Sequence, residues 1–439
     1  MDDEVRDDSE WTQRTTPGPE TDRGMIAAAE ARPEETKHPE DRRSPAGMRI
    51  GTLLLGIVIG AAAMFLVLNA LTGSVLGESG ILDEETIAKI GTLVNLIDES
   101  YYEADEVDTD QLQEGLYRGL VDALDDPYSV YYTVDEIEDL EESLSGSFSG
   151  IGAYVSLDET TGYPKIAGVI PGSPAEAAGL LTDDIIVEAD GESLAGLDLD
   201  VAVSRIRGEE GTSVHLSIYR SGEPDYLEFD IVRAVVDSET AAGEMLDAEN
   251  GIGYIQITEF DDVTCEQVEE ILFDLLDQGM EGLVIDLRDN PGGTVDAVTS
   301  IAQYLIPKGL IFYMEYPDGT REEYSADGTD YIDLPIAVLI NGNSASASEI
   351  LSSAIQESGA GVVIGTQSYG KGVVQTIYSL TDGTGVKLTV AEYFTRNGNS
   401  IHGIGVTPDV EIALDTDAYL EDGTDTQLEA AVSELLGSM

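Results

Sequence analysis

The sequence predicts a mixed fold: an α/β domain and a smaller α+β module, behind an N-terminal helical region and a transmembrane helix. From Ser238 onwards, strand patterns alternate with helix patterns, which is typical of an α/β layer with largely parallel strands. Residues 146–235 contain short strands separated by glycine and proline turns, which indicate a small α+β module. Residues 48–71 form an apolar run of roughly 20 residues, enough to span a bilayer as a helix.

The first 71 residues predict a tail and a membrane anchor. Residues 1–47 are polar and lack apolar periodicity, which predicts a disordered cytoplasmic tail. Arg42, Arg43 and Arg49 flank the start of the apolar run, so the positive-inside rule places everything after about residue 72 outside the membrane. A cleaved signal peptide is the alternative, but the tail is far longer than a usual n-region. We therefore expect a single-pass cell-membrane protein whose residues after the anchor form extracytoplasmic domains.

The composition argues against nucleic acid as a partner and indicates an organism that lives in high salt. The chain has 87 acidic and 21 basic residues and a formal net charge of −66, so nucleic-acid binding is not expected. The acidic excess is spread over every region and would repel itself in dilute buffer. Molar salt shortens the Debye length to about 3 Å and removes most of that cost, which predicts a halophilic organism. An ordinary acidic protein is the alternative. A cation-binding surface is a third interpretation, but no Asp-rich calcium loop with its glycine and glutamate spacing occurs.

Cysteine and histidine give no sign of a disulfide, a metal site or a cofactor. Cys265 is the single cysteine, so no intrachain disulfide can form. The three histidines lie far apart and none has a companion at metal-ligand spacing. We expect neither a metal nor a cofactor.

Two regions precede the α/β domain. Residues 82–145 predict helices, with apolar side chains at three- and four-residue steps. In residues 146–235 the predicted exposed strand edge lies beside a glycine-bearing loop, Gly150-Ile151-Gly152-Ala153. Such an edge can add a peptide as an extra strand while the loop captures its terminal carboxylate. The order of motifs here resembles a PDZ domain, with these four residues in the place of its carboxylate-binding loop. The alternative is that the glycines only permit tight turns.

The α/β domain, residues 236–415, brings two polar turns to one edge. Apolar strands end just before Asn290–Gly293 and before Ser344–Ser348. Ligands of parallel sheets gather at the carboxyl ends of the strands, so the two turns predict a site. Residues 306–334 predict a hairpin insertion, and residues 416–439 predict a C-terminal helical tail.

The residue types at this edge favour a serine–lysine hydrolase. A serine at a strand-to-helix turn exposes its hydroxyl, and the N–H groups of the helix N-terminus can hold an oxyanion. Lys371 lies among glycines and valines, and burial without a carboxylate partner disfavours the charged form of an amine that must act as a base. Spacing alone does not choose among Ser344, Ser346 and Ser348. Ser348 could instead cap the following helix.

Over about residues 82–439 the order of modules resembles the carboxyl-terminal processing proteases, the tail-specific serine peptidases. The matching stretches are Asp126–Ser129, Gly150–Gly152, Arg207–Gly208, Asp286–Gly293, Ser344–Glu349 and Gly370–Gln375. The resemblance implies that Ser346 is the nucleophile, Lys371 its general base and Gln375 the residue that orients the lysine.

It further implies an oxyanion hole made by the N–H of Ala347 and that of Gly292 or Gly293, between which the sequence does not choose. Arg288 and Asp289 are expected to brace that loop through salt bridges.

The implied function is an endopeptidase that reads protein C-termini through its PDZ domain and cleaves near them. Its partners would be polypeptides with free C-termini. Arg207 is a candidate for relaying PDZ occupancy to the catalytic layer, and the helices at 82–125 and 425–436 could mediate a homo-oligomer. Two rivals are a membrane-anchored PDZ scaffold that binds without cutting and an acyl-transfer enzyme for small thioesters, which would not explain the PDZ module.

Overall fold

The computed structural model describes residues 80–439 in two compact units, which divide after Glu106. The predicted tail (1–47) and membrane anchor (48–71) lie outside the described residues. Within residues 80–439, no helix is both long enough and apolar enough to cross a membrane. The first unit contains α2 (Glu84–Ser100) and the short η1 (Ala104–Glu106). Asp83 begins α2 as an N-cap, because its carboxylate accepts a hydrogen bond from the Thr86 N–H at 2.7 Å.

The second unit begins with two helices and a strand that the sequence did not predict. These elements are α3 (Thr109–Asp122), β1 (Val130–Tyr132) and α4 (Val134–Ser145). The strand β1 pairs antiparallel with β18 (Gly385–Thr395), which lies more than 250 residues later in the chain. The sequence around β1 therefore does not reveal its hydrogen-bonding partner. A capping box between Thr133 and Glu136 starts α4, and Gly146 ends it in the left-handed conformation at φ 67°.

The α+β module, which matches the predicted PDZ-like fold, contains one main sheet and two helices. Its elements are β3 (Ala153–Leu157), β4 (Pro164–Val169), α5 (Pro174–Ala178), β5 (Ile185–Ala189), β6 (Glu192–Ser193), α6 (Leu199–Ile206), β7 (Ser213–Tyr219) and β8 (Leu227–Val232). The sheet order is β3-β4-β5-β7-β8, with β6 on β5, so β3 is an edge strand. Helix α6 contacts β3. The strands β2 (Ser147–Gly150) and β9 (Ala234–Asp237) form a separate antiparallel pair beside it.

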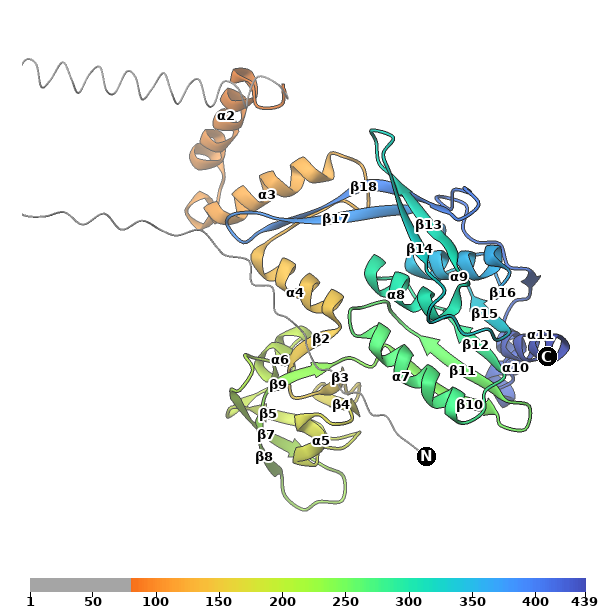
Figure 1. Cartoon of the computed structure of the whole chain (residues 1–439). Coiled ribbons are helices and arrows are strands. Elements are labelled where there is room, and N and C mark those ends of the chain that lie inside the picture. Colours follow the sequence, from red (N-terminus) through yellow and green to blue (C-terminus); the bar gives the residue numbers. More distant parts are fainter. Residues whose placement is uncertain (1–79) are drawn as a thin grey trace, which may run out of the picture. The chain divides into compact units, whose positions relative to one another are not determined.

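The α/β domain is a three-layer arrangement around a six-stranded sheet (Figure 1). Its strands are β10 (Ala241–Asp247), β11 (Ile252–Ile257), β12 (Gly282–Asp286), β15 (Ile336–Ile340), β16 (Gly361–Gly365) and β19 (Val410–Glu411), in that order. Only β10 and β11 pair antiparallel, which agrees with the predicted parallel layer.

Helices cover both faces of that sheet. The helices α7 (Thr264–Asp277), α8 (Val295–Leu305) and α9 (Ala347–Ser358) pack on one face, and α11 (Thr426–Ser438) packs on the other. Every residue of β12 and β15 is therefore buried, as expected for parallel strands covered on both faces.

A second sheet carries the predicted hairpin. The strands β13 (Gly309–Glu315) and β14 (Arg321–Ala326) pair antiparallel, which confirms the insertion, and β13 also pairs with β18. The strands β17 (Val373–Ser379) and β18 form a long hairpin, and Lys371 lies just before it. The short α10 (Thr416–Asp422) precedes α11.

Candidate active site

Ser346 occupies a sharp turn between β15 and α9. It is the N-cap residue of α9 and has φ 54° and ψ −113°, a positive-φ conformation that a residue with a side chain rarely adopts. Ser348 lies inside α9 and not at its N-cap, and its hydroxyl donates to the Asn290 carbonyl at 3.1 Å. The Ser344 hydroxyl donates to the Leu287 carbonyl at 2.7 Å. Of the three serines, Ser346 is the one on a strained strand-to-helix turn of the kind that presents a nucleophile.

A buried carboxylate ties this turn to the loop that carries Lys371. Glu349 is fully buried, and its Oε2 accepts hydrogen bonds from the N–H groups of Ser346 and Lys371, both at 2.9 Å. Its Oε1 accepts from the Gly370 N–H at 2.7 Å and from the Ser368 hydroxyl at 2.5 Å. One carboxylate therefore fixes the backbone at both candidate reacting residues.

Tyr393 makes a second connection between the same two residues. Its hydroxyl donates to the Lys371 carbonyl at 2.6 Å and lies 3.2 Å from the Ser346 carbonyl. The side chain is almost fully buried, and this burial raises the pKa of its hydroxyl well above the usual value. The hydroxyl therefore stays protonated and acts as a donor.

The surroundings of Lys371 favour a neutral amine. Burial lowers the pKa of Lys371, the positive charge of Lys387 lowers it further, and Glu349 opposes both. The Lys371 ammonium lies 5.1 Å from the ring centroid of Tyr128. Within residues 80–439, Lys371 forms no ion pair, so its charge has no carboxylate directly against it. The amine is thus poised toward the form that accepts a proton.

A cavity of about 380 Å³ brings most of the predicted site residues together. Ser346, Ala347, Gly293, Lys371 and Gln375 all line it. The predicted residues that do not line this cavity are Gly292, the loop 150–153 and Arg207.

Gln375 contacts the opposite strand of the hairpin. Its amide donates to the Thr389 hydroxyl at 3.3 Å. Since Gln375 and Thr389 are directly paired on β17 and β18, this contact holds the side chain at the cavity wall.

Gly292 and Gly293, in the predicted oxyanion loop Asn290–Gly293, differ in their hydrogen bonding and packing. The Gly292 N–H donates to the Asn290 side chain at 2.8 Å, and a Cβ at Gly292 would lie 2.7 Å from the Ser346 Cβ. Gly292 is therefore a close-contact position against Ser346. Gly293 forms a parallel bridge with Phe260 and lines the cavity. No residue among 80–439 accepts a hydrogen bond from the Gly293 N–H.

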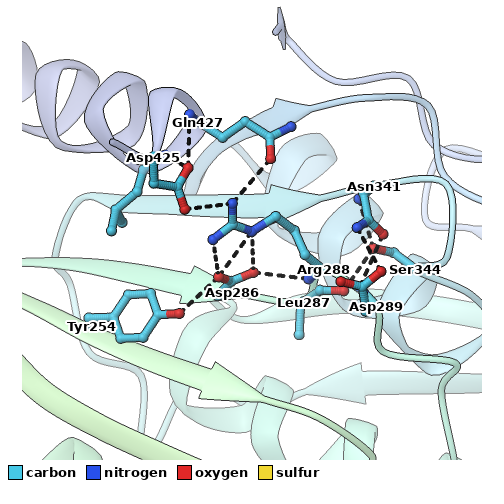
Figure 2. Close-up of polar contacts among 10 residues, drawn as sticks. Tyr254, Asp286, Leu287, Arg288, Asp289, Asn341, Ser344, Asp425 and Gln427 are labelled. Carbon is cyan, nitrogen blue, oxygen red and sulfur yellow. Dashed lines mark hydrogen bonds and ion pairs between the residues drawn. The ribbon is translucent and has the colours of Figure 1, made fainter. Parts of the chain in front are cut away.

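Behind the oxyanion loop lies the ion-pair network shown in Figure 2. Arg288 donates to both oxygens of the buried Asp286, with a shortest distance of 2.6 Å, and pairs with Asp425 at 2.8 Å. The Tyr254 hydroxyl donates to Asp286 at 2.8 Å, and burial raises the pKa of that hydroxyl above its usual value. Arg288 therefore braces the loop, as expected.

Asp289 braces the loop by hydrogen bonds instead of the expected salt bridge. Its carboxylate accepts from the Asn341 and Asn343 side chains at 3.0 and 2.8 Å, and these bonds lower its pKa. The two strand ends are thus held together by neutral amide donors.

The candidate peptide-binding loop is pinned to the start of α5. The Ile151 carbonyl accepts from the Ala175 N–H at 2.7 Å, and the Gly152 carbonyl accepts from the Ser173 hydroxyl at 3.0 Å. Gly152 has φ 78°, and a Cβ there would lie 2.3 Å from the Ser173 Cβ, so glycine is required. The loop leads through Ala153 into the edge strand β3.

Comparison with known proteins identifies the family. A model of peptidase family S41 matches residues 251–412, a PDZ-domain model matches residues 165–220, and a model of the N-terminal domain of the activating protease CtpB matches residues 57–136. The carboxy-terminal processing protease CtpA of Bacillus subtilis (strain 168) is 36% identical over 364 residues, which are 82% of this chain and 76% of the relative. The chain belongs to the carboxy-terminal processing proteases of peptidase family S41. It is therefore a serine peptidase with a PDZ domain.

Another curated protein and one solved structure are also similar to this chain. CtpB of the same organism is 38% identical over 331 residues, which are 75% of this chain and 68% of CtpB. The solved structure of a photosystem II D1 C-terminal processing protease has 30% sequence identity and a TM-score of 0.44, and the match covers 72% of this chain and 88% of that one.

Sequence reasoning missed several side chains of this S41 peptidase site. Tyr128 and Lys387 both act on Lys371, but nothing in the sequence around either residue points to that lysine. Glu349 carried a usable signal. It lies three residues after Ser346, the spacing at which a glutamate bonds back to the N-cap N–H.

Proposed function

We propose that this S41 peptidase is a membrane-anchored, extracytoplasmic endopeptidase that captures the C-terminus of a polypeptide with its PDZ domain and cuts near that end by a serine–lysine mechanism. The observation that carries the mechanism is that Ser346, on its strained turn, and the half-buried Lys371 line one cavity with two backbone N–H donors. The family comparison supports the substrate class, because PDZ domains bind peptide ends.

In the proposed first half-reaction, the neutral Lys371 amine takes the proton of the Ser346 hydroxyl as the oxygen attacks the scissile carbonyl carbon. The N–H groups of Ala347 and Gly293 stabilise the negative charge that develops on the carbonyl oxygen. Collapse of the tetrahedral intermediate breaks the C–N bond, and the Lys371 ammonium gives its proton to the leaving amine. The product is an ester between Ser346 and the acyl part of the substrate.

In the second half-reaction, water attacks that ester while Lys371 takes a proton from the water. Return of the proton to Ser346 regenerates the hydroxyl and releases the new carboxylate. Gln375 is proposed to limit the positions that the Lys371 amine samples, since it occupies the same cavity wall.

Gly293 is the better candidate for the second oxyanion donor. The Gly292 N–H is already bonded to the Asn290 side chain, whereas Gly293 faces the cavity. A donor that is preorganised and unused costs little reorganisation when charge develops. Gly292 is then required for its small size beside Ser346.

Arg207 is proposed to couple the PDZ domain to the catalytic layer. Its guanidinium donates to Glu142 of α4 at 3.1 Å and lies 5.2 Å from the ring centroid of Phe148. Helix α4 also presents Leu140 and Leu144 to the candidate active-site cavity. A shift of the α6 end on peptide binding can therefore reach that cavity through α4.

The cellular setting of the proposal comes from the sequence alone. The apolar run 48–71 and its flanking arginines support a single-pass anchor with the peptidase outside the membrane. The net charge of −66 supports a halophilic organism, so assays belong in molar salt.

The experiment is cleavage of matched peptides with free and amidated C-termini by the wild-type chain and by Ser346→Ala and Lys371→Met variants, in high salt. We expect the wild type to prefer the free C-terminus, and both variants to lose cleavage while Ser346→Ala still binds the free peptide. Equal cleavage of both peptides would refute C-terminal recognition. Full activity of Lys371→Met would refute the serine–lysine mechanism.

A further inference from the structure

A second cavity, of about 560 Å³, lies where α4, β2 and the end of α6 meet the loop before α7. The side chains on its walls are mostly acidic. Five carboxylates line it: Asp139, Glu142, Asp200, Glu259 and Asp261. The one basic side chain of the lining is Arg207, which pairs with Glu142. The cavity therefore has a strong excess of negative charge that the described residues do not neutralise.

Asp261 is the unusual member of this group. It is only 4% exposed, and within residues 80–439 its carboxylate has no hydrogen-bond or ion-pair partner. Burial raises its pKa to about 7, and the charges of Glu259 and Asp262 act in the same direction. The Asp261 carboxylate opens on the cavity and has no partner there among the described residues, so a cation that enters the cavity can form a hydrogen-bonded ion pair that folding left unmade.

The wall behind Asp261 is rigid. Gly146 ends α4 with φ 67°, and a Cβ there would lie 2.8 Å from the Asp261 Cβ and 2.6 Å from a Val263 methyl group. The carboxylate is therefore held against the cavity by close packing.

The size and lining of the cavity favour an organic cation over a metal ion. Among residues 80–439, no three Asp, Glu, His or Cys side chains converge as metal ligands. Phe148 and Val203 add apolar surface to the lining. A lysine or arginine side chain matches this combination, because its apolar stem can lie on such surface while its charged end reaches a carboxylate.

The position of the cavity links it to the peptide-binding loop. Strand β2 passes from Phe148, on the cavity wall, to Gly150, the first residue of the candidate carboxylate-binding loop. On the opposite wall, α6 contributes Asp200, Val203 and Ser204. The four-residue strand β2 therefore connects the cavity wall directly to the loop that is predicted to hold the end of a polypeptide.

We propose that this cavity binds the lysine or arginine side chain of a polypeptide substrate near its C-terminus, and so selects substrates with a basic residue at that place. The proposal rests on the proposed function, specifically on capture of the terminal carboxylate by residues 150–153.

The test is a binding scan with the full chain carrying Ser346→Ala, which prevents cleavage. Fluorescent neutral peptides with a free C-terminus receive one lysine, placed in turn at each position near that end, and norleucine at the same positions is the uncharged control. Fluorescence anisotropy gives Kd at about pH 8, above the pKa of Asp261. We expect lysine at one position, or at two neighbouring ones, to tighten binding about tenfold, as a hydrogen-bonded ion pair does.

Variants then assign the preference to the cavity. Asp261→Asn removes a charge and keeps the shape, so it should abolish the lysine preference and leave the affinity for the norleucine peptides unchanged. Glu259→Gln, at an exposed part of the lining, should weaken the preference. Asp262→Asn is the matched control, because Asp262 is exposed and does not line the cavity. In the Ser346→Ala chain without a cavity substitution, the preference for lysine over norleucine should fall when the pH is below the pKa of Asp261.

Each outcome bears on a different claim. A lysine preference that is absent at every position, or that survives in both Asp261→Asn and Glu259→Gln, overturns the cavity proposal and leaves C-terminal capture standing. Equal affinity for free and amidated norleucine peptides overturns the capture itself, and the cavity proposal falls with it.

Discussion

Replacing Glu349 by glutamine should destabilise the peptidase core and impair catalysis together. The carboxylate accepts four hydrogen bonds, two on each oxygen, from the loops of Ser346 and Lys371. A glutamine has one acceptor oxygen and one donor NH₂. At the Oε2 position the NH₂ faces two backbone N–H donors, whereas at the Oε1 position it faces the Gly370 N–H and the Ser368 hydroxyl, which can turn to accept. One or two hydrogen bonds to a charged group are then lost, at about 1.5–3 kcal/mol each, or about 1.5–6 kcal/mol in all.

That loss is a large part of a typical stability of about 5–15 kcal/mol. The two loops also lose their common anchor, and misplacement of reacting groups by about 1 Å costs on the order of 10²-fold in rate. We therefore expect kcat/KM of Glu349→Gln to fall about 10²-fold on the plateau of the pH profile. The charge of Glu349 raises the pKa of Lys371, so its removal lowers that pKa further. The acid limb of the pH profile should consequently move to lower pH.

Denaturant unfolding and the pH dependence of peptide cleavage, both in molar salt, measure the two effects. Glu357→Gln is the matched control, since Glu357 is on the same helix and accepts three hydrogen bonds from residues 395–399. It should lose stability without moving the acid limb. If Glu349→Gln unfolds within about 1 kcal/mol of wild type and keeps its kcat/KM, the carboxylate does not hold the two loops, and the reasoning is refuted.

Three further predictions concern charge. Lys387→Met should raise the pKa of Lys371 by removing a like charge, so the acid limb of the kcat/KM profile should move to higher pH. Lys387→Arg keeps the charge and should leave the limb in place. An acid limb that does not move in Lys387→Met would contradict this prediction. Hydrogen bonds to the carboxylates of Asp230 and Glu228 raise the pKa of His215, so the charged imidazole stabilises the fold at low pH. His215→Gln should therefore lower the melting temperature at about pH 5.5 and match wild type at about pH 9. A loss of melting temperature that grows as the pH rises would contradict this prediction. Arg288→Met leaves the buried Asp286 carboxylate without its ion-pair partner and should lower the free energy of unfolding in denaturant by about 3–5 kcal/mol. Asp425→Asn should lower it less, because Arg288 keeps its pair with Asp286. Equal losses in the two variants would refute this ranking.

The sequence by itself determined the repeating elements and the residue types of the site. The apolar runs of β12 and β15, the amphipathic helices and the hairpin at 306–334 follow from local periodicity and turn residues, which depend on neighbours in the chain. The placement of polar turns at strand ends also follows from such patterns, because parallel strands share one edge. The fold class was therefore predictable, and it is confirmed except for the transmembrane helix, which lies outside the described residues.

Only the tertiary structure decided which groups are buried together and which donors remain unused. Strand β1 has three residues and takes its hydrogen bonds from β18, so no local pattern could predict it. Glu349, Tyr393 and Lys387 act on Lys371 across gaps of 16–22 residues, and their effects depend on desolvation and through-space charge. The difference between Gly292 and Gly293 likewise depends on where the Asn290 side chain points. Burial and hydrogen-bond partners are properties of the packed chain, and for that reason the sequence left them open.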